Sequence, residues 1–392
     1  MNFFIADVQT GFGSFEAFYL AQLGWSQGNI GVALSVGNMA GVLSQIPGGA
    51  LADWVRWKRG LAAAGILMTA LAALILALAP SFILVFGAQI LQGAAAGIVT
   101  PVIGAISLGL VGRSGMSLRT GRNFRYSAAG HALTAALMGV AGAYLFKSAI
   151  FVAAAALCIP ALIALGFIRG SEIDYARARN ARSKRDDGKQ TITTARILDL
   201  AKNRKLVLFM AAMLLFQLAD ASMLPMVGVD IARSLGQDAA LWMSGLLIIP
   251  QVVVAILAPW VGFHSEKRGR RPLLLIGFIL EPLRAFMLAA TAAYPVVAIA
   301  QGLSGLTGAV IGVLTVIVVA DLTAGTGRFN LALGVLGTIN AIAASVSTGI
   351  TGFIFQALGP RFGYLPLAAV AIAATALLWV FLTETKPAKY ED

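Results

Sequence analysis

The chain has little of what soluble and secreted proteins depend on. Among its 392 residues there are one Cys and two His, and charged residues make up 12%. A single Cys cannot form a disulfide within the chain, which excludes a disulfide-stapled scaffold. So few Cys and His leave too few ligands for a zinc site built from these two residue types. Soluble domains carry about 25% charged residues, so this composition excludes an ordinary soluble protein.

Long apolar stretches take the place of the missing charges. Hydrophobic residues make up 59% of the sequence, and the mean hydropathy is +0.85. A helix that crosses a membrane needs about 20 mostly apolar residues, and the stretches lack the alternation expected of membrane-barrel strands. Twelve spanning helices are predicted, at residues 3–23, 29–52, 61–79, 82–111, 124–146, 149–168, 206–229, 240–263, 272–292, 295–320, 330–357 and 364–383.

The positive charges indicate which side of the membrane is cytoplasmic. The net charge of +12 would suit a nucleic-acid-binding protein if the basic residues formed one patch. With the N-terminus inside, however, 25 of the 29 Lys and Arg residues fall in cytoplasmic segments, as the positive-inside rule requires. We therefore expect that the protein has no nucleic-acid partner. It is predicted to be embedded in the lipid of the cell inner (cytoplasmic) membrane, with both termini in the cytoplasm. The first segment contains Asp7 and Glu16 and follows no basic stretch, so it is predicted to be a retained helix.

A polar interval divides the twelve segments into two sets of six. Residues 169–205 are rich in Lys and Arg and interrupt the apolar pattern. They are predicted to form a cytoplasmic linker between an N-terminal six-helix bundle (1–168) and a C-terminal six-helix bundle (206–392). The predicted fold class is therefore an all-α polytopic membrane protein.

The two halves share a motif at equivalent places. Segment two ends with Gly49, three residues, Asp53 and a basic cluster. Segment eight ends with Gly262, three residues, Glu266 and a basic cluster, 213 residues further on. Two weaker matches follow in the same order, Gln92 with Gln301 at a separation of 209 and residues 120–123 with 326–330 at 206. Internal repeats of this kind are typical of secondary transporters.

Both copies resemble the loop motif of the major facilitator superfamily, which occurs after helix 2 and again after helix 8. The second copy is nearly complete, with Glu for Asp, whereas Trp54 and Arg56 depart from the pattern in the first. The resemblance implies two bundles around a central cavity, transport by alternating access, and a gating role for the motif. The residues that it assigns to the gating motif are Gly49, Asp53, Lys58, Arg59, Gly262, Glu266, Lys267, Gly269 and Arg271.

A small electrostatic effect would be enough for such a gate. The acid at the end of segment two can lie near a helix N-terminus, where it gains about 0.3–1 kcal/mol, or near a basic residue. An effect of this size biases two states of similar energy without locking either. The alternative is that the charges only set the topology. Two departures from the family pattern weaken the assignment of this chain as a standard multidrug antiporter. Gln89 stands where segment four often carries an Arg associated with proton coupling, and segment five lacks the Gly-Pro motif of many drug antiporters.

Three acids in the segments expected to line the cavity are candidates for proton coupling. A charge inside a span costs about 2.5–3.5 kcal/mol on insertion scales, so it points to function. Asp220 follows Gln217 on one face of segment seven, with no base nearby in that segment. Asp7 and Glu16 lie nine residues apart, on opposite faces of segment one, so one of them is expected to face the cavity. The alternative for Asp7 is the cytoplasmic interface.

Uncharged polar residues form stripes on the segments that the resemblance places around the cavity. Such stripes also serve helix packing, so both interpretations stay open. The candidates for the substrate cavity are Gln89, Gln92, Thr100, Gln217, Gln301 and Ser304. Glu281 and Arg284 of segment nine are spaced i, i+3 and are predicted to form a structural ion pair, with a substrate site as the alternative. No metal and no cofactor are expected.

These features predict a proton-coupled secondary transporter that acts as a monomer. The expected cavity-lining segments hold acids but no Lys or Arg, which favours a small cationic, zwitterionic or neutral organic solute over an anion. Export is preferred, and an uptake symporter or uniporter is the alternative. A membrane enzyme is the remote alternative, because such chemistry needs clustered Asp or His near the interface. The one Asp pair, Asp186-Asp187, lies in the basic linker.

Overall fold

The protein is built from long helices. The computed structural model describes residues 1–5, 16, 19, 20, 23, 25, 27–144, 148–180, 199–227 and 239–387, and within these ranges there is no β-strand. The helices are α3 (Gln27–Trp54), α4 (Lys58–Leu78), α5 (Phe82–Tyr144), α6 (Ala149–Gly166), α7 (Tyr175–Ala178), α9 (Arg204–Asp220), α11 (Ala239–Arg268), α12 (Arg271–Ala290), α13 (Tyr294–Leu322) and α14 (Phe329–Phe381), with a 3-10 turn at Gly170–Glu172.

Two of the helices each contain two predicted spans. α5 bends sharply at Gly112 (φ +68°) and α14 at Gly359 (φ +78°), both in the left-handed region that favours glycine. In the described part of the chain, eight helical stretches are long and apolar enough to cross a membrane. Most of the first predicted segment, including Asp7, lies outside the described residues.

The predicted start of segment five is wrong. A loop was expected before residue 124, but the helix resumes directly after Gly112. Residues 113–123 carry Arg113, Arg119 and Arg122 among apolar side chains such as buried Met116. Such a stretch remains helical beyond the apolar span because one of its faces packs against the protein. Arg122 is exposed, whereas Arg113 reaches Asp321 of the second half.

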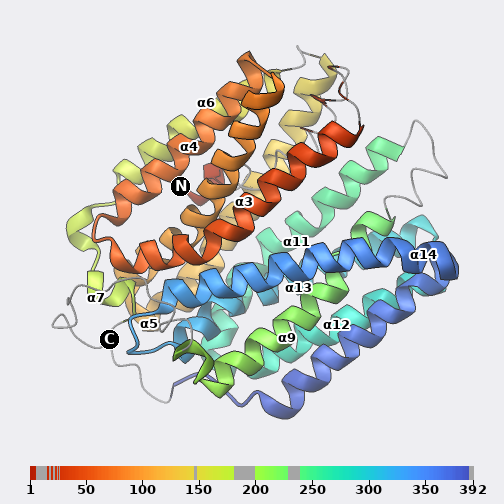
Figure 1. Cartoon of the computed structure of the whole chain (residues 1–392). Helices are drawn as coiled ribbons and strands as arrows, with labels where there is room; N and C mark the ends of the chain where they lie inside the picture. The colour runs from red at the N-terminus through yellow and green to blue at the C-terminus, as the bar shows by residue number, and fades with distance from the viewer. Residues whose placement is uncertain are drawn as a thin grey trace.

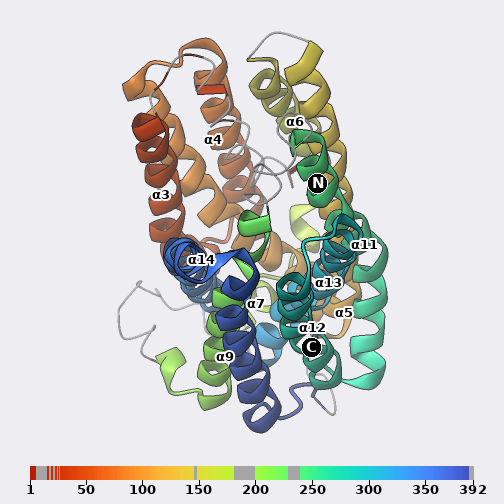
Figure 2. The same ribbon diagram turned by 90° about the vertical axis from the view of Figure 1, so that its right-hand side faces the viewer.

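The helices of each half gather together. Figure 1 shows α3, α4 and α6 on one side and α9, α12 and α13 on the other, and Figure 2 shows the same division after a quarter turn. α14 turns back on itself at its bend, so its first and last turns lie at the same end of the molecule as α7 (Figure 1). That end holds the connections predicted to be cytoplasmic.

Separate apolar clusters stabilise the two halves. Phe151 and Leu76 belong to a cluster of the first half, whereas Phe209 and Phe278 belong to a larger one formed mostly by the second half. Four buried residues of the first half join that larger cluster: Ala50, Leu108, Met116 and Ala128. The halves therefore pack directly against each other near these residues, and the proposed bundle boundaries at 168 and 206 remain a prediction.

Candidate functional site

The first glycine of each motif copy lies where the two halves touch. A Cβ on Gly49 of α3 would come within 3.0 Å of the backbone carbonyl of Asn330 in α14. A Cβ on Gly262 of α11 would meet the backbone carbonyl of Ser117 in α5 in the same way. Gly49 and Gly262 are 213 residues apart, and so are Ser117 and Asn330. The two helix crossings are therefore equivalent residue for residue.

A second pair of glycines completes each crossing. Gly334 of α14 approaches the backbone of Gln45 in α3, and Gly121 of α5 approaches that of Ala258 in α11. These pairs again differ by 213. The separation of 206 inferred for residues 120–123 and 326–330 is therefore wrong, since 120–123 lie inside α5 whereas 326 and 327 precede α14.

Asp53 of the first copy binds the first turn of α14. Its carboxylate accepts hydrogen bonds from the Asn330 side chain (2.7 Å), the Asn330 backbone N–H (3.3 Å) and the Leu331 backbone N–H (2.8 Å). The free N–H groups at a helix start favour an anion. This is the helix N-terminus arrangement that the sequence suggested for the acid.

The beginning of the linker reinforces this first crossing. The carbonyl of Ala178 in α7 accepts a second hydrogen bond from the Asn330 side chain (3.0 Å). The side chain of Asn180 donates to the carbonyl of Ala320 in α13 (2.6 Å). Nearby, the Lys58 ammonium donates to the carbonyl of Ala52, at the end of α3. The linker residues thus connect the two halves through uncharged groups.

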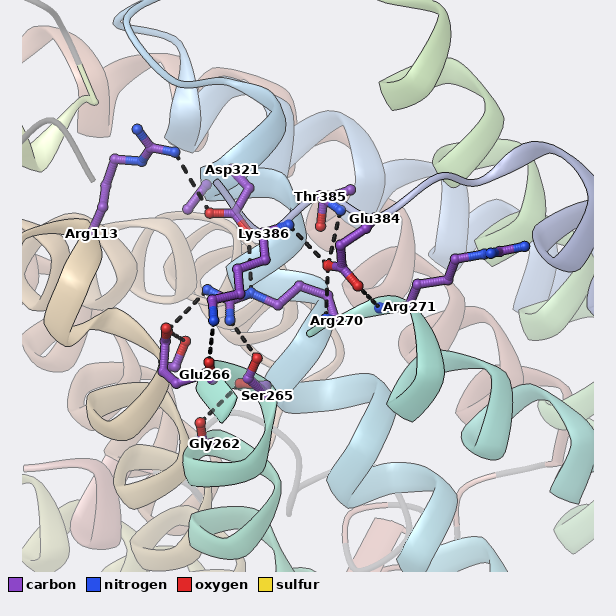
Figure 3. Close-up of polar contacts among 12 residues, drawn as sticks. Arg113, Gly262, Ser265, Glu266, Arg270, Arg271, Asp321, Glu384, Thr385 and Lys386 are labelled. Carbon is purple, nitrogen blue, oxygen red and sulfur yellow. Dashed lines mark hydrogen bonds and ion pairs between the residues drawn. The ribbon is translucent and has the colours of Figure 1, made fainter. Parts of the chain in front are cut away.

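Glu266 of the second copy belongs to an ionic network instead. It accepts hydrogen bonds from the Ser117 hydroxyl and from Arg270 (2.9 Å), as Figure 3 shows for the arginine. Arg270 also bonds Asp321 (3.2 Å between Nε and Oδ2), and Arg113 of the first half reaches the same carboxylate (3.7 Å). Arg270, whose side chain is 1% exposed, is the centre of the network.

The segment after α14 reinforces this second crossing. Glu384 accepts hydrogen bonds from the backbone N–H groups of Arg270 (2.8 Å) and Arg271 (3.2 Å), and the Lys386 ammonium donates to the carbonyl of Glu266 (Figure 3). Gly269 has a φ of +90°, and a Cβ there would collide with Glu384. Burial acts to raise the pKa of Glu384, but hydrogen bonds from backbone N–H groups outweigh it and leave the pKa below its usual value.

The basic residues that end each copy bind the last helix of their own half. Arg59 donates to the carbonyl of Gly166, at the end of α6 (3.2 Å), and Arg271 donates to that of Trp379, near the end of α14 (2.7 Å). A cation is favoured at a helix C-terminus. Lys267, also assigned to the motif, lies over the ring of Phe263 (4.2 Å to the centroid). This contact of Lys267 lies within one helix.

A central cavity lies between the halves. It has a volume of about 370 Å³ and is lined by residues of both halves, among them Thr100, Asn123, Ser127, Gln217, Thr315 and Asn340. None of the lining residues in the described part of the chain is charged. Thr100 and Gln217 are the predicted cavity residues that line it. Gln89, Gln92, Gln301 and Ser304 do not.

A larger groove, of about 1010 Å³, has a different character. It is lined by apolar residues of α3 and α5, such as the well exposed Met39 and Leu43. All its lining residues come from the first half. The central cavity, which both halves share, is therefore the better candidate for a transport site.

Glu16 lies deep inside the first half. Its side chain is fully buried, and one carboxylate oxygen accepts a hydrogen bond from the side chain of Gln89. The other oxygen has no hydrogen-bond partner among the described residues. Gln89, which replaces the family's Arg, is thus a direct partner of the acid. Asp7 lies outside the described residues, so its place relative to Glu16 stays a prediction.

Asp220 is not isolated from bases, as its own segment suggested. Arg284 of α12 donates from one nitrogen, Nη1, to Asp220 of α9 (2.7 Å) and to Glu281 (3.1 Å). The pair predicted on segment nine therefore exists, but it is a cluster of two acids and one base that joins two helices.

Sequence reasoning missed most partners of the motif acids. Ser117, Asn330, Arg270, Asp321 and Glu384 all bind the motif copies directly or through one residue. The separation of 213 residues, read off the motif, would have paired Ser117 with Asn330. Nothing in the local sequence signals Glu384.

The whole sequence matches a known family. The model of the Major Facilitator Superfamily matches residues 1–229 and 209–392. An uncharacterized MFS-type transporter of Mycobacterium tuberculosis, recorded for two strains, is 32% identical over 387 residues, which are 98% of this chain and 92% of that protein. The class B tetracycline resistance protein of Escherichia coli is 30% identical over 150 residues, 38% of this chain and 37% of that protein.

Solved structures share the fold over nearly the whole chain. A proton:xylose symporter of the superfamily, XylE, bound to 6-bromo-6-deoxy-D-glucose has a TM-score of 0.74 at 14% identity and covers 98% of this chain and 94% of its own. A mutant of the nucleoside transporter NupG has a TM-score of 0.66 at 15% identity, and the match covers 97% of this chain and 98% of the NupG chain. The predicted fold of two six-helix bundles is confirmed. The chain belongs to the Major Facilitator Superfamily and is a multi-pass membrane transporter, not an enzyme.

Proposed function

We propose that the protein is a proton-coupled secondary transporter that exports a small organic solute by alternating access. The central cavity between the halves carries this proposal, because it is lined by hydroxyl, amide and apolar groups of both halves. Such a lining can bind a neutral or zwitterionic solute by hydrogen bonds and apolar contact. A cationic solute remains within the proposal, because Glu16 and Asp220 lie inside the two bundles even though neither lines the cavity.

The contacts of the two motif copies define the closed end of this transporter. Asp53, near the end of α3, and Glu266, near the end of α11, each bond the other half. The end of α3 lies at the end of the molecule that holds α7 (Figure 1). With the termini in the cytoplasm, this is the cytoplasmic side. Opening toward the cytoplasm would then require the Asp53–Asn330 and Glu266–Ser117 hydrogen bonds to break together.

Glu16 supports the coupling to protons. A buried carboxylate with an amide as its partner and one free oxygen is poorly stabilised as an anion. Binding a proton removes that charge, and release requires access to water. Glu16 does not line the cavity in this conformation, so in the proposed cycle it exchanges its proton with water only after the halves have rearranged.

The proposal also includes the direction of transport, which is export. The partial likeness to a tetracycline resistance protein favours export, and XylE, a proton:xylose symporter, shares only the fold. An uptake symporter or a uniporter of the same fold is the second candidate. Action as a monomer in the inner membrane is part of the proposal.

Transport in liposomes tests the proposal. The purified protein would be reconstituted with a pH-sensitive dye inside, and neutral, zwitterionic, cationic and anionic solutes would be added outside. We expect proton movement with a neutral, zwitterionic or cationic solute, and none in empty liposomes. Proton movement with anions alone would contradict the cavity argument, and solute movement without protons would favour the uniporter.

A further inference from the structure

The cluster of Asp220, Glu281 and Arg284 has more acid than base. Both carboxylates accept a hydrogen bond from the same nitrogen of Arg284. If all three groups were ionised, the cluster would carry a net negative charge. The side chains of Glu281 and Arg284 are 0% and 1% exposed. An uncompensated charge at such a buried site is costly.

No other charged group of the surrounding helices, within their described residues, offsets this excess. The ionisable side chains of α13 are Tyr294 and Asp321, at opposite ends of that helix, and those of described α11 begin at His264, near its cytoplasmic end. α9 contributes Asp220 itself and two bases at its first turn. α14 contributes the hydroxyl of Tyr364, which acts on Arg284, and the exposed Arg361. The balance of charge is therefore left to the cluster itself.

One atom shows where a proton would fit. Oε1 of Glu281 is buried and receives no hydrogen bond from the described residues. The other oxygen of Glu281 and one oxygen of Asp220 bond the same nitrogen of Arg284, so the two carboxyl groups lie close together. Two carboxylate oxygens cannot bond each other unless one carries a proton. A proton on Glu281 would supply the missing donor and remove the excess charge in one step.

The cluster also has a path to water. The side chain of Asp220 is 31% exposed, unlike its two partners. It lies one helical turn beyond Gln217, which lines the central cavity, and residues three apart share a helix face. Asp220 is not itself among the cavity-lining residues, but it is the exposed member of the pair, so it is the member through which a proton would enter while Glu281 stays buried.

We propose that Asp220 and Glu281 form a two-carboxylate proton-binding site around Arg284, in which Glu281 is a working member and not a structural residue. One proton from water binds to the pair, and the carboxyl group that takes it is released from full ion pairing with Arg284. Arg284 joins α9 to α12 through Asp220, so a proton on Glu281 leaves this contact in place and frees Arg284 to pair with Asp220 alone. The inference rests on the proposed proton coupling, but the binding of the proton itself can be measured without transport.

Infrared difference spectroscopy between acidic and alkaline buffer, on the full chain in lipid vesicles without any solute, tests the site. A protonated carboxylic acid has a C=O stretching band that disappears when it ionises. We expect wild type to show such a band, Glu281→Gln to lose it, and Asp220→Asn to shift it. Glu172→Gln is the matched control, because Glu172 pairs with Arg169 at the same i, i+3 spacing but is exposed.

The outcomes separate this inference from the proposed function. If Glu281→Gln keeps every wild-type band, the site is wrong, even if solute still drives protons in liposomes. If the band disappears as expected but no solute moves protons, the site stands and the coupling fails. If Glu281→Gln fails to insert in the membrane, Asp220→Asn provides the test. A C=O band that is unshifted in Asp220→Asn would overturn the inference, because a proton shared by the two carboxyl groups must respond to the loss of either one.

Discussion

The acids of the two motif copies have different partners. Asp53 of the first copy is 8% exposed and binds one amide side chain and two backbone N–H groups. The Glu266 side chain of the second copy is 22% exposed and lies in a network of two arginines and a second acid. The glycine crossings beneath them are equivalent. The repeat has therefore kept the backbone geometry and changed the chemistry. The comparison suggests that close helix approach makes the gate. The acid of each copy can secure it either mainly through amide and backbone N–H groups, with Lys58 acting on Asp53 from nearby, or through a network of ion pairs.

The largest effect should come from filling a crossing. In Gly49→Leu the added atoms would overlap the backbone of Asn330, and overpacking of this kind costs up to about 3 kcal/mol, or roughly 100-fold in the closed population. We expect a cysteine at Leu336, a buried residue of the cavity lining, to react far faster with an impermeant maleimide in inside-out vesicles. Gly87→Leu is the control, because a Cβ there meets nothing within 4 Å. Equal rates in the two variants would show that the crossing is not needed for closure.

Asp53→Asn should have the next largest effect. Hydrogen bonds to a charged group contribute about 1.5–3 kcal/mol, and the amide retains one acceptor oxygen. We expect roughly tenfold faster labelling of the Leu336→Cys reporter. The variant should still insert in the membrane, which surface expression would check. Unchanged labelling would leave the motif with a topological role alone.

Glu266→Gln should have a smaller effect that depends on salt. Arg270 keeps Asp321 as a partner when Glu266 loses its charge, and partly exposed pairs contribute about 0.2–1 kcal/mol. We expect labelling to rise about two- to fivefold at low ionic strength. The difference from wild type should shrink in about 1 M salt, where charges are screened within about 3 Å. The effect of Asp53→Asn should shrink less, because its hydrogen-bond partners and the nearby Lys58 are buried away from salt. If both substitutions respond alike, the chemical contrast between the copies is wrong.

The smallest effect is expected at the segment that reinforces the second copy. The pKa of Glu384 is lowered in the folded protein, so its stabilising contribution is present above the unfolded pKa of about 4.5 and is lost as the pH falls through the lower, folded pKa. Glu384→Gln should therefore lower the Tm slightly near neutral pH, and the two proteins should converge at acidic pH, below the folded pKa. Thermal unfolding in detergent at both pH values measures it. A difference that grows on acidification would contradict the sign.

The sequence predicted what depends on local pattern. The apolar segments gave most of the helices, and the motif gave Gly49, Asp53, Gly262 and Glu266, each of which lies at a contact between the halves. The helical continuation after Gly112 was missed, because basic residues there were read as a loop.

Partners far apart in the chain could not be predicted. Asn330 lies 277 residues from Asp53, and Arg284 lies 64 residues from Asp220. A single segment carries no information about the side chain that a neighbouring helix presents. For this reason Asp220 was interpreted as free of bases and the pair on segment nine as self-contained, and both interpretations changed once the helices were packed.

The central claim is that both motif copies bias one equilibrium between open and closed cytoplasmic states. A double-mutant cycle tests it most directly, with Asp53→Asn, Glu266→Gln and the double variant all carrying the Leu336→Cys reporter. The claim predicts that the two substitutions add in free energy, so that labelling in the double variant rises by the product of the single changes until the open state is saturated. Labelling that neither substitution alters, or a double variant no faster than the faster single variant while labelling is far from saturation, would contradict it.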